Sequence, residues 1–272
     1  MLGLCSLKTG SCWAFAATEQ IESEFVLAGG PSVVLSAQQV TSCTVEYSNS
    51  SGRREDLECC YGCDGGDPSY AYEVLAGGVG LSPAAWWPYT QSLTRLSETE
   101  PCRKDTSELV DEYFYLGPYA TIASYSYAVP PCSNGACESQ DVSALAAAAA
   151  ESPVAVCVNA ETWDDYVGGV MSLESCGGVA ITDLDHCVQL VGYNSVADKP
   201  YWILRNSWSA GWGQDGFIYL QFGENTCGIP THKKTGGVSF SFAERARARW
   251  KKHLCVSWQF FFGPERSFSE EL

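Results

Sequence analysis

The 272-residue sequence lacks long apolar runs. No stretch approaches the roughly 18 consecutive apolar residues that a membrane-spanning helix requires, so we expect no membrane span. The longest monotonous run, from Ala144 to Ala150, is too short to span a membrane and predicts an ordinary helix. A hydrophobic content of 46% with 18% charged residues is typical of a folded globular protein rather than a disordered chain.

Positive charge is also scarce. The chain has 16 Lys and Arg residues against 32 Asp and Glu, which gives a net charge of −16 at pH 7. Residues 1–232 carry 8 basic and 28 acidic side chains, whereas residues 233–272 carry 8 and 4. A body this acidic repels nucleic acid, so we expect no nucleic-acid partner. Its carboxylates are better tolerated in an acidic organelle, which is compatible with a lysosome-like setting.

Histidine is rare, with three residues in the chain. His232 follows a Gly-Ile-Pro turn, and His253 lies in residues 243–272, a basic and aromatic stretch that we expect to be an extension outside the main fold. His186 begins a predicted strand directly after a turn at 182–185. It is therefore the histidine best placed to present an imidazole for acid–base chemistry.

Cysteine, in contrast, is abundant, with 14 residues. Such a number favours an oxidising compartment, secretory or vacuolar, and several disulfides. Residues 1–8 nevertheless do not look like a signal peptide, because no charged region precedes their short apolar run. These two observations disagree, and we expect that the chain as given lacks its natural beginning.

Periodicity predicts a helix-rich first half. Apolar residues recur at helical spacing from Trp13 to Phe25, and the turn before them places Cys12 at or near a helix N-terminus. Shorter helices are predicted at 35–40, where Ser36 is the candidate N-cap, and at 70–75. The polar segment 44–61 is predicted to be a loop.

The second half is rich in strand signals. Strands are predicted at 154–158, 186–193, 201–205 and 216–221, separated by turn residues. Helices followed by strands predict an α+β fold of two lobes, at about 10–115 and 116–242, with a cleft between them.

Cys12 is the candidate nucleophile. A cysteine attacks as the thiolate, so its pKa has to be lowered from its usual value near 8.5. The positive end of a helix and a nearby imidazolium both do this, and His186 is the candidate for the second. The imidazole in turn needs a third group to orient it, for which Asn206 is well placed at the end of the predicted strand 201–205.

Five blocks of the sequence resemble, in the same order, the signature blocks of the papain/cathepsin family of cysteine peptidases. They are residues 10–15 (GSCWAF), 35–39 (LSAQQ), 62–66 (GCDGG), 185–193 (DHCVQLVGY) and 206–213 (NSWSAGWG). The resemblance extends over residues 10–231. It implies a papain-like fold with a helical lobe and a β-barrel-like lobe, closer to the cathepsin L-like branch than to the cathepsin B-like one.

The resemblance also implies roles for individual residues. Cys12 attacks the scissile carbonyl, His186 protonates the leaving amine, Asn206 orients the imidazole, and Trp208 shields that hydrogen bond from water. The residues that would contact substrate are Gly65, Gly66, Asp67, Pro68, Val154, Cys187 and His232. The resemblance therefore implies an endopeptidase that cleaves polypeptides. In its reaction Cys12 is acylated, and the resulting thioester is then hydrolysed.

The oxyanion hole departs from the family pattern. The backbone N–H of Cys12 supplies one donor, but Ser6 stands where the family has a glutamine. Losing one such donor costs about 100- to 1000-fold in turnover, and Ser6 is a doubtful replacement. The alternative is therefore a catalytically impaired papain-fold pseudoenzyme or an incomplete gene model.

The family pattern implies two disulfides, Cys43–Cys102 and Cys176–Cys227. Cys132 and Cys137 are close enough in sequence to close a small loop, and Cys59 and Cys60 are left unassigned. Cys63 lacks its expected partner because Thr9 stands there, and Cys5 is a possible substitute. Cys60 and Cys63 also have the spacing of half a zinc site, but no second close pair completes it, so we expect no metal and no cofactor.

The expected partners are polypeptide substrates and, by resemblance, a propeptide or cystatin-like inhibitors. We expect a monomer, located in the lysosome or vacuole or outside the cell. A rival hypothesis is a disulfide-rich extracellular binding module, which predicts that Cys12 is disulfide-bonded.

Overall fold

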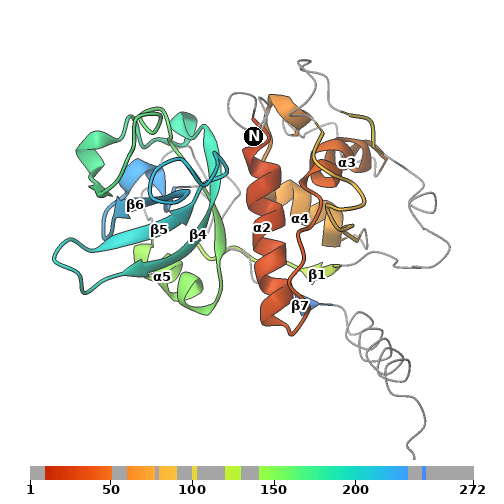
Figure 1. The fold of residues 1–272 in the computed structure, drawn as a ribbon, viewed down its shortest axis with the longest axis horizontal. Coiled ribbons are helices and arrows are strands. Elements are labelled where there is room, and N and C mark those ends of the chain that lie inside the picture. The colour runs from red at the N-terminus through yellow and green to blue at the C-terminus, as the bar shows by residue number, and fades with distance from the viewer. Residues whose placement is uncertain are drawn as a thin grey trace, which may run out of the picture.

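The structure is a computed structural model that describes residues 10–50, 60–76, 80–90, 100–102, 120–129, 141–231 and 241–242. Two lobes lie side by side, one mainly helical and the other built on a sheet (Figure 1). The architecture is α+β, as the order of elements in the sequence predicts. None of the helices in the described ranges has the length and apolar character needed to cross a bilayer.

Three helices form the first lobe: α2 (Cys12–Leu27), α3 (Ala37–Ser50) and α4 (Pro68–Ala76). The first half of α2 is buried nearly all round, with Trp13, Ala14 and Ala17 at 0% exposure, so it is the centre of this lobe. Such all-round burial agrees with the continuous apolar stretch at residues 12–17.

Capping residues set where α3 and α4 begin. The Ser36 hydroxyl accepts a hydrogen bond from the Gln39 N–H at 3.0 Å, so Ser36 caps α3 as predicted. The Asp67 carboxylate accepts hydrogen bonds from the N–H and the hydroxyl of Ser69 at 2.8 and 2.6 Å, and Pro68 occupies the first turn of α4, where no N–H is needed. The predicted loop at 44–61 is wrong in its first part, because α3 continues to Ser50.

The second lobe contains an open five-stranded sheet in the order β2-β4-β5-β6-β3. Its strands are β2 (Val154–Val158), β3 (Val170–Met171), β4 (His186–Asn194), β5 (Tyr201–Arg205) and β6 (Phe217–Gln221). All neighbours are antiparallel except β3 and β6. The four longer strands agree with the predicted ones to within one residue at each end.

Helix α5 (Val142–Glu151) packs on this sheet, and the Asp141 carboxylate caps it by accepting from the Ala144 N–H at 2.9 Å. Short 3-10 helices occupy the turns of both lobes, at η2 (Gly62–Asp64), η4 (Leu173–Ser175), η5 (Ile181–Asp183) and η6 (Thr226–Gly228).

A two-stranded ribbon of β1 (Ile122–Ser124) and β7 (Ser241–Phe242) lies against α4, at the helical lobe (Figure 1). Ala120 and Ile122 pack into the core of that lobe, whereas Val129 packs into the core of the other. Residues 122 and 129 therefore belong to different lobes, and the predicted boundary near 115 lies outside the described residues. The predicted extension at 243–272 lies outside the described residues.

Helix α2 also contacts the sheet lobe. The Gln20 side-chain oxygen accepts from the Ala155 N–H of β2 at 2.8 Å and from the Tyr72 hydroxyl of α4 at 2.9 Å. The Gln189 side chain of β4 donates to the Glu19 carbonyl at 2.9 Å. These buried bonds fix α2 against the sheet lobe, and the N-terminus of α2 meets the start of β4.

The structure contains the two disulfides that the resemblance implies, Cys43–Cys102 and Cys176–Cys227. A third, Cys157–Cys187, joins β2 to β4. Cys60 and Cys63 are also disulfide-bonded, so neither sulfur is available as a zinc ligand. Cys5, Cys59, Cys132 and Cys137 lie outside the described residues.

Candidate active site

Three of the predicted site residues come together where the lobes meet. Cys12 is the first residue of α2, His186 is the first residue of β4, and Asn206 directly follows β5. The three side chains are 7%, 7% and 6% exposed. The fold thus brings into contact groups that are up to 194 positions apart in the sequence, counted from Cys12 to Asn206.

Cys12 is the free cysteine of the described residues. Burial alone raises the pKa of its thiol, but the charge of His186, a hydrogen bond with that ring and the backbone N–H groups of Cys187 and Trp13 outweigh burial and lower the pKa below its ordinary value. The free thiol contradicts the hypothesis of a binding module in which Cys12 is disulfide-bonded. Its surroundings favour a thiolate, the form in which cysteine is a nucleophile.

His186 responds in the opposite direction. Burial lowers the pKa of its ring, but the charge of Cys12 and hydrogen bonds with Cys12 and Asn206 raise that pKa above its ordinary value. A pair in which the thiol becomes more acidic and the imidazole more basic favours the thiolate–imidazolium form.

Asn206 fixes the orientation of the ring. Its Oδ1 lies 2.8 Å from His186 Nε2 and also accepts the Ser207 N–H at 2.8 Å. Since an amide oxygen only accepts, Nε2 carries a proton and donates it to Asn206, which leaves Nδ1 for Cys12. The hydrogen bond from the Ser207 N–H fixes the orientation of the Asn206 amide, with its oxygen toward His186. Among the described residues, Asn206 Nδ2 has no hydrogen-bond partner.

Two tryptophans enclose the imidazole. The ring centroid of Trp208 is 5.0 Å from that of His186 at an interplanar angle of 32°, in line with its predicted shielding position. Trp163 meets the same ring edge-on at 6.0 Å and is fully buried. Sequence reasoning missed Trp163 because it lies in an irregular segment with no motif around it. Both indoles therefore lie against the ring that makes the buried bond to Asn206.

The glycine-rich turn lies beside the nucleophile. Trp13 donates its indole N–H to the Gly62 carbonyl at 3.1 Å, and a Cβ on Gly66 would lie 2.3 Å from the same indole. A Cβ on Gly65 would instead meet open space, and Gly65 has a φ of +118°. Gly66 is thus required for packing, while Gly65 leaves free space next to the chain.

The other predicted substrate contacts fall into three groups. Pro68 is buried, and Asp67 is half-buried with its carboxylate engaged in capping α4. Cys187 follows His186 and is bound to Cys157. Ser6 and His232 lie outside the described residues.

Val154 is not where the prediction placed it. Its side chain is 1% exposed and belongs to the core of the sheet lobe, together with Val156 and Val158. Side chains alternate along a strand, so Ala155 and Cys157 occupy the opposite face of β2, toward α2. Cys157, two positions along the face from Ala155, is the β2 residue that lies near Cys12.

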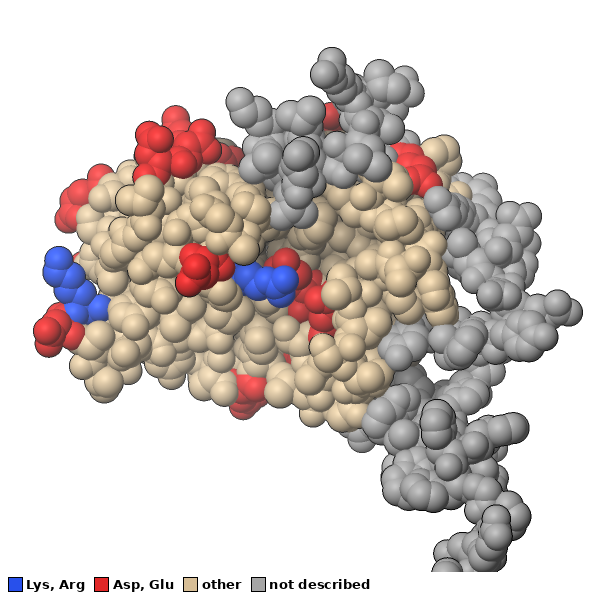
Figure 2. Space-filling model, in the orientation of Figure 1, with Lys and Arg blue, Asp and Glu red and all other residues tan. Residues whose placement is uncertain are grey.

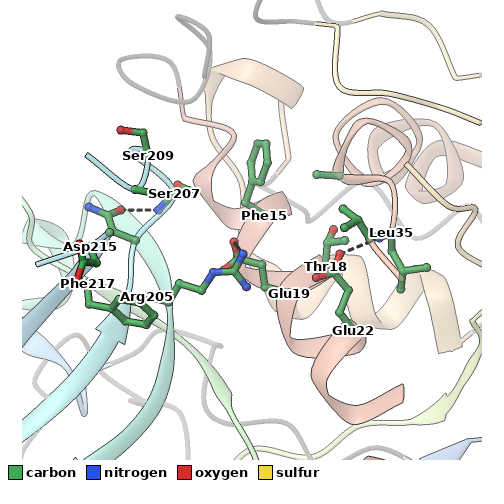
Figure 3. A pocket seen from close by; sticks show the side chains of 15 residues that line it. Phe15, Thr18, Glu19, Glu22, Leu35, Arg205, Ser207, Ser209, Asp215 and Phe217 are labelled. Carbon is green, nitrogen blue, oxygen red and sulfur yellow. Dashed lines mark hydrogen bonds and ion pairs between the residues drawn. The ribbon is translucent and has the colours of Figure 1, made fainter. Parts of the chain in front are cut away.

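A pocket of about 300 Å³ also lies between the lobes, but neither Cys12 nor His186 lines it. Arg205 extends from the end of β5 toward Glu19 of α2, with Phe15 and Glu22 nearby (Figure 3). The pocket shares Asn206 with the candidate site and is otherwise separate from it.

Surface charge agrees with the composition. On the face drawn in Figure 2, acidic side chains are spread over the molecule and basic ones are few. This face therefore offers no extended basic patch for a polyanion.

Within the described ranges, no three His, Cys, Asp or Glu side chains are grouped so that they could hold a metal ion.

Comparison with known proteins gives a consistent result. A family model described as papain family cysteine protease matches residues 6–236. A cysteine proteinase of Trypanosoma brucei brucei is 35% identical over 80% of this chain and 40% of that protein. Human cathepsin O is 29% identical over 81% of this chain and 57% of that protein.

Solved structures agree with this match. Procathepsin L 3 from the larval midgut of Tenebrio molitor superposes with a TM-score of 0.65 and 28% identity, over 86% of this chain and 64% of that one. Bromelain from Ananas comosus, in complex with the E64 inhibitor, gives 0.62 and 27%, over 87% and 91%. The chain spans 40% to 59% of the length of the curated relatives that it matches.

Proposed function

This chain belongs to the papain family of cysteine proteases, and from that premise we propose that it is an endopeptidase with Cys12 as nucleophile, His186 as acid–base group and Asn206 as the orienting residue. The observation that carries the proposal is the geometry: the free thiol of Cys12 begins α2, and His186 lies against it with its Nε2 2.8 Å from Asn206 Oδ1. The directions of the pKa shifts, with the thiol more acidic and the ring more basic than usual, agree with a catalytic pair.

The first half of the reaction is acylation. The Cys12 thiolate attacks the scissile carbonyl carbon, and the carbonyl electrons move to the oxygen. The backbone N–H of Cys12, in the first turn of α2, is among the donors that have no partner inside the helix and is available to the oxyanion. His186 then gives its Nδ1 proton to the leaving amine, and a thioester remains on Cys12.

The second half is hydrolysis of the thioester. Neutral His186 takes a proton from water, the resulting hydroxide attacks the thioester carbonyl, and the carboxylic acid product leaves as Cys12 becomes a thiolate again. Asn206 holds the ring in one orientation throughout, because its oxygen accepts from Nε2 in both protonation states of His186. Trp208 and Trp163 keep bulk water from competing for that bond.

The substrate is a polypeptide that lies between the lobes, along the glycine-rich turn. The open space beside Gly65 accommodates its backbone, and Pro68 of the helical lobe and Cys187 of the sheet lobe are proposed contacts. Since Val154 faces the core, Cys157 takes its place in the proposed contact set. Asp67 and His232 remain proposed members, as does Ser6 in the oxyanion hole.

The setting of the protein follows from the same reasoning. Three disulfides between described residues favour an oxidising compartment, and we propose the lysosome or vacuole, or the extracellular space. Procathepsin L 3 is a proform, and by that likeness a propeptide is a proposed partner, together with cystatin-like inhibitors. We further propose a monomer with a peptidase unit at 1–242.

Labelling with E64, the inhibitor bound in the bromelain structure, tests the assignment. We expect the purified chain to take up one equivalent on Cys12, located by peptide mapping, and to cleave an internally quenched peptide at an inner bond. Cys12→Ala should abolish both, and His186→Ala should nearly abolish both. A folded chain that takes up no label would contradict the proposal and favour the impaired pseudoenzyme or the incomplete gene model.

A further inference from the structure

The disulfide between β2 and β4 lies next to the proposed catalytic pair. Cys157 and Cys187 occupy directly opposed positions in the two strands, with Cα atoms 4.0 Å apart. Cys187 is the residue after His186, and the next pair of the same register is Val158 with His186. The Cys157–Cys187 disulfide is therefore in the residue pair next to the one that contains His186, the proposed base.

The disulfide also faces the nucleophile. Cys157 and Cys187 belong to the buried cluster that contains Cys12 and the helices of the first lobe. Their neighbours along the strands, Val156 and Val188, belong to the core of the sheet lobe. Since successive side chains alternate between faces, the two sulfurs lie on the α2 side of the sheet. They are 9% and 6% exposed, close to the 7% of Cys12 itself.

The backbone of Cys187 acts on the thiolate directly. Its N–H is one of the groups that hydrogen-bond to Cys12 and lower the pKa of that thiol, alongside the charge of His186. Residues 186 and 187 thus supply the imidazolium and one hydrogen-bond donor from the same two positions of β4. Any shift at this end of the strand displaces both groups together.

The strand that holds this end in place is itself at an edge. β2 is the first strand in the order β2-β4-β5-β6-β3, so in the described sheet its one neighbouring strand is β4. An edge strand is tied on one side and opens more readily than a central one. A covalent bond at 157–187 prevents such opening at the position where the site needs the geometry fixed.

We propose that the Cys157–Cys187 disulfide is a positioning element that holds the start of β4, with His186 and the Cys187 N–H, against Cys12, so that opening it slows alkylation of Cys12 and slows turnover. This inference rests on the proposed role of Cys12 as nucleophile. A displacement of about 1 Å at a reacting group costs up to roughly 100-fold in rate, so loosening one strand end has a measurable effect.

The test compares two double variants. Cys157→Ala with Cys187→Ala removes the disulfide beside the site, and Cys176→Ala with Cys227→Ala removes another disulfide of the same lobe, one that packs in the opposite core. For each, the rate of Cys12 alkylation by iodoacetamide is followed against pH with mass spectrometry, together with kcat and KM on a peptide and thermal unfolding.

We expect both variants to unfold at lower temperature than the unmodified chain, because each loses a cross-link. Only the first should move the alkylation profile, to higher pH by about one pH unit, and lower kcat by about 10-fold, whatever KM does through the proposed substrate contacts of Cys157 and Cys187. An unchanged profile in the first variant, or the same shift in both, would overturn the inference. A high-pH profile already in the unmodified chain would instead count against the proposed function.

Graded reduction of the unmodified chain provides a second measurement if the first variant does not fold. A phosphine opens the Cys157–Cys187 bond to increasing extents, which mass spectrometry quantifies, while a short alkylation pulse at pH 6 reports Cys12 reactivity. The inference requires reactivity to fall in proportion to the fraction opened. Constant reactivity in molecules whose bond is open would contradict it.

Discussion

The Arg205 guanidinium reaches from the end of β5 to within 3.7 Å of the Glu19 carboxylate on α2 (Figure 3). The Glu19 side chain is 11% exposed, whereas that of Arg205 is 47% exposed. Burial therefore outweighs the attraction of the half-exposed cation, and with the repulsion of Glu22 it raises the pKa of Glu19 to about 7. The contact between the lobes thus contains a carboxyl group that titrates near neutral pH.

This titration makes stability depend on pH. In the folded state the pKa of Glu19 is above its ordinary value of 4.5, so its contribution is fully present below about pH 4.5 and is lost as pH rises through 7. The total loss is roughly 3 kcal/mol. We expect Glu19→Gln to be about as stable as the unmodified chain at pH 5 and more stable at pH 8, as measured by urea unfolding with the disulfides intact.

Glu161→Gln is the matched control, since it removes a carboxylate that is exposed. It should leave the difference between pH 5 and pH 8 unchanged. If Glu19→Gln behaves in the same way as this control, Glu19 does not titrate in the folded protein over that range.

Replacement of Asn206 tests how the imidazole is oriented. Asn206→Ala removes the acceptor of the 2.8 Å bond from His186 Nε2, and the ring is then free to rotate. We expect kcat to fall by about 100-fold with KM nearly unchanged, because orientation matters most in the transition state. Steady-state kinetics on a peptide substrate checks this, and a change confined to KM would contradict an orienting role.

The same variant should alter the pH profile. The bond to Asn206 is one of the interactions that raise the pKa of His186, after the charge of Cys12 and the hydrogen bond with it. The active pair requires a protonated ring, so activity is lost at high pH when the imidazolium deprotonates. We therefore expect the alkaline limb of kcat/KM to move to lower pH in Asn206→Ala. Asn159→Ala, at a buried asparagine bonded to the Gly178 carbonyl, is the control and should keep the limb in place.

The two glycines beside the nucleophile should respond differently to alanine. At Gly66 the new Cβ would lie 2.3 Å from the buried Trp13 indole, so Gly66→Ala should cost about 1 to 3 kcal/mol of folding free energy. At Gly65 the Cβ enters open space, but φ of +118° with ψ of 164° is a backbone conformation that L-residues rarely adopt, so Gly65→Ala costs about 1 to 3 kcal/mol through backbone strain alone. Denaturant unfolding of the two variants compares these costs.

The KM for a peptide substrate tests the proposed role of Gly65 in binding the substrate backbone. If the substrate backbone passes along Gly65, a methyl group there should raise KM several-fold in the folded variant. A normal KM in a folded Gly65→Ala variant would mean that substrate does not run along this turn.

Thiol and imidazole acidity can be measured through the overall pH optimum. Because the pKa of Cys12 is lowered and that of His186 is raised, the thiolate–imidazolium form exists between the two apparent values of the pair. We expect a bell-shaped dependence of kcat/KM with its acid limb below the ordinary thiol pKa and its alkaline limb above the ordinary imidazole pKa. A single rise near pH 8.5 would indicate an isolated cysteine.

The sequence was most informative where the signal is local. Strands of five residues or more have clear alternation or buried apolar runs, and β2, β4, β5 and β6 were predicted from them. The two-residue strands β3 and β7 are too short to produce a period, and they exist only because a partner strand is present. The end of α3 was missed because its polar residues lack an apolar stripe.

The candidate site shows the same limit. Cys12, His186 and Asn206 were found because each lies at the end of an element next to recognisable residues. Val154 was misplaced because the choice between the two faces of β2 depends on which face meets α2, and that contact is formed in three dimensions. The Cys157–Cys187 bond requires the register between β2 and β4, which spacing along the chain does not reveal.

Helix α2 is held by both lobes, through the Gln20 oxygen that accepts from Tyr72 on one side and Ala155 on the other. Cys12 starts this helix, and His186 starts a strand of the second lobe, so the two meet only after the lobes have docked. Before that contact forms, Cys12 lacks both the charge of His186 and the hydrogen bond with its ring, two of the interactions that lower the pKa of the thiol. The acidity of this thiol therefore reports on whether the two lobes are correctly joined.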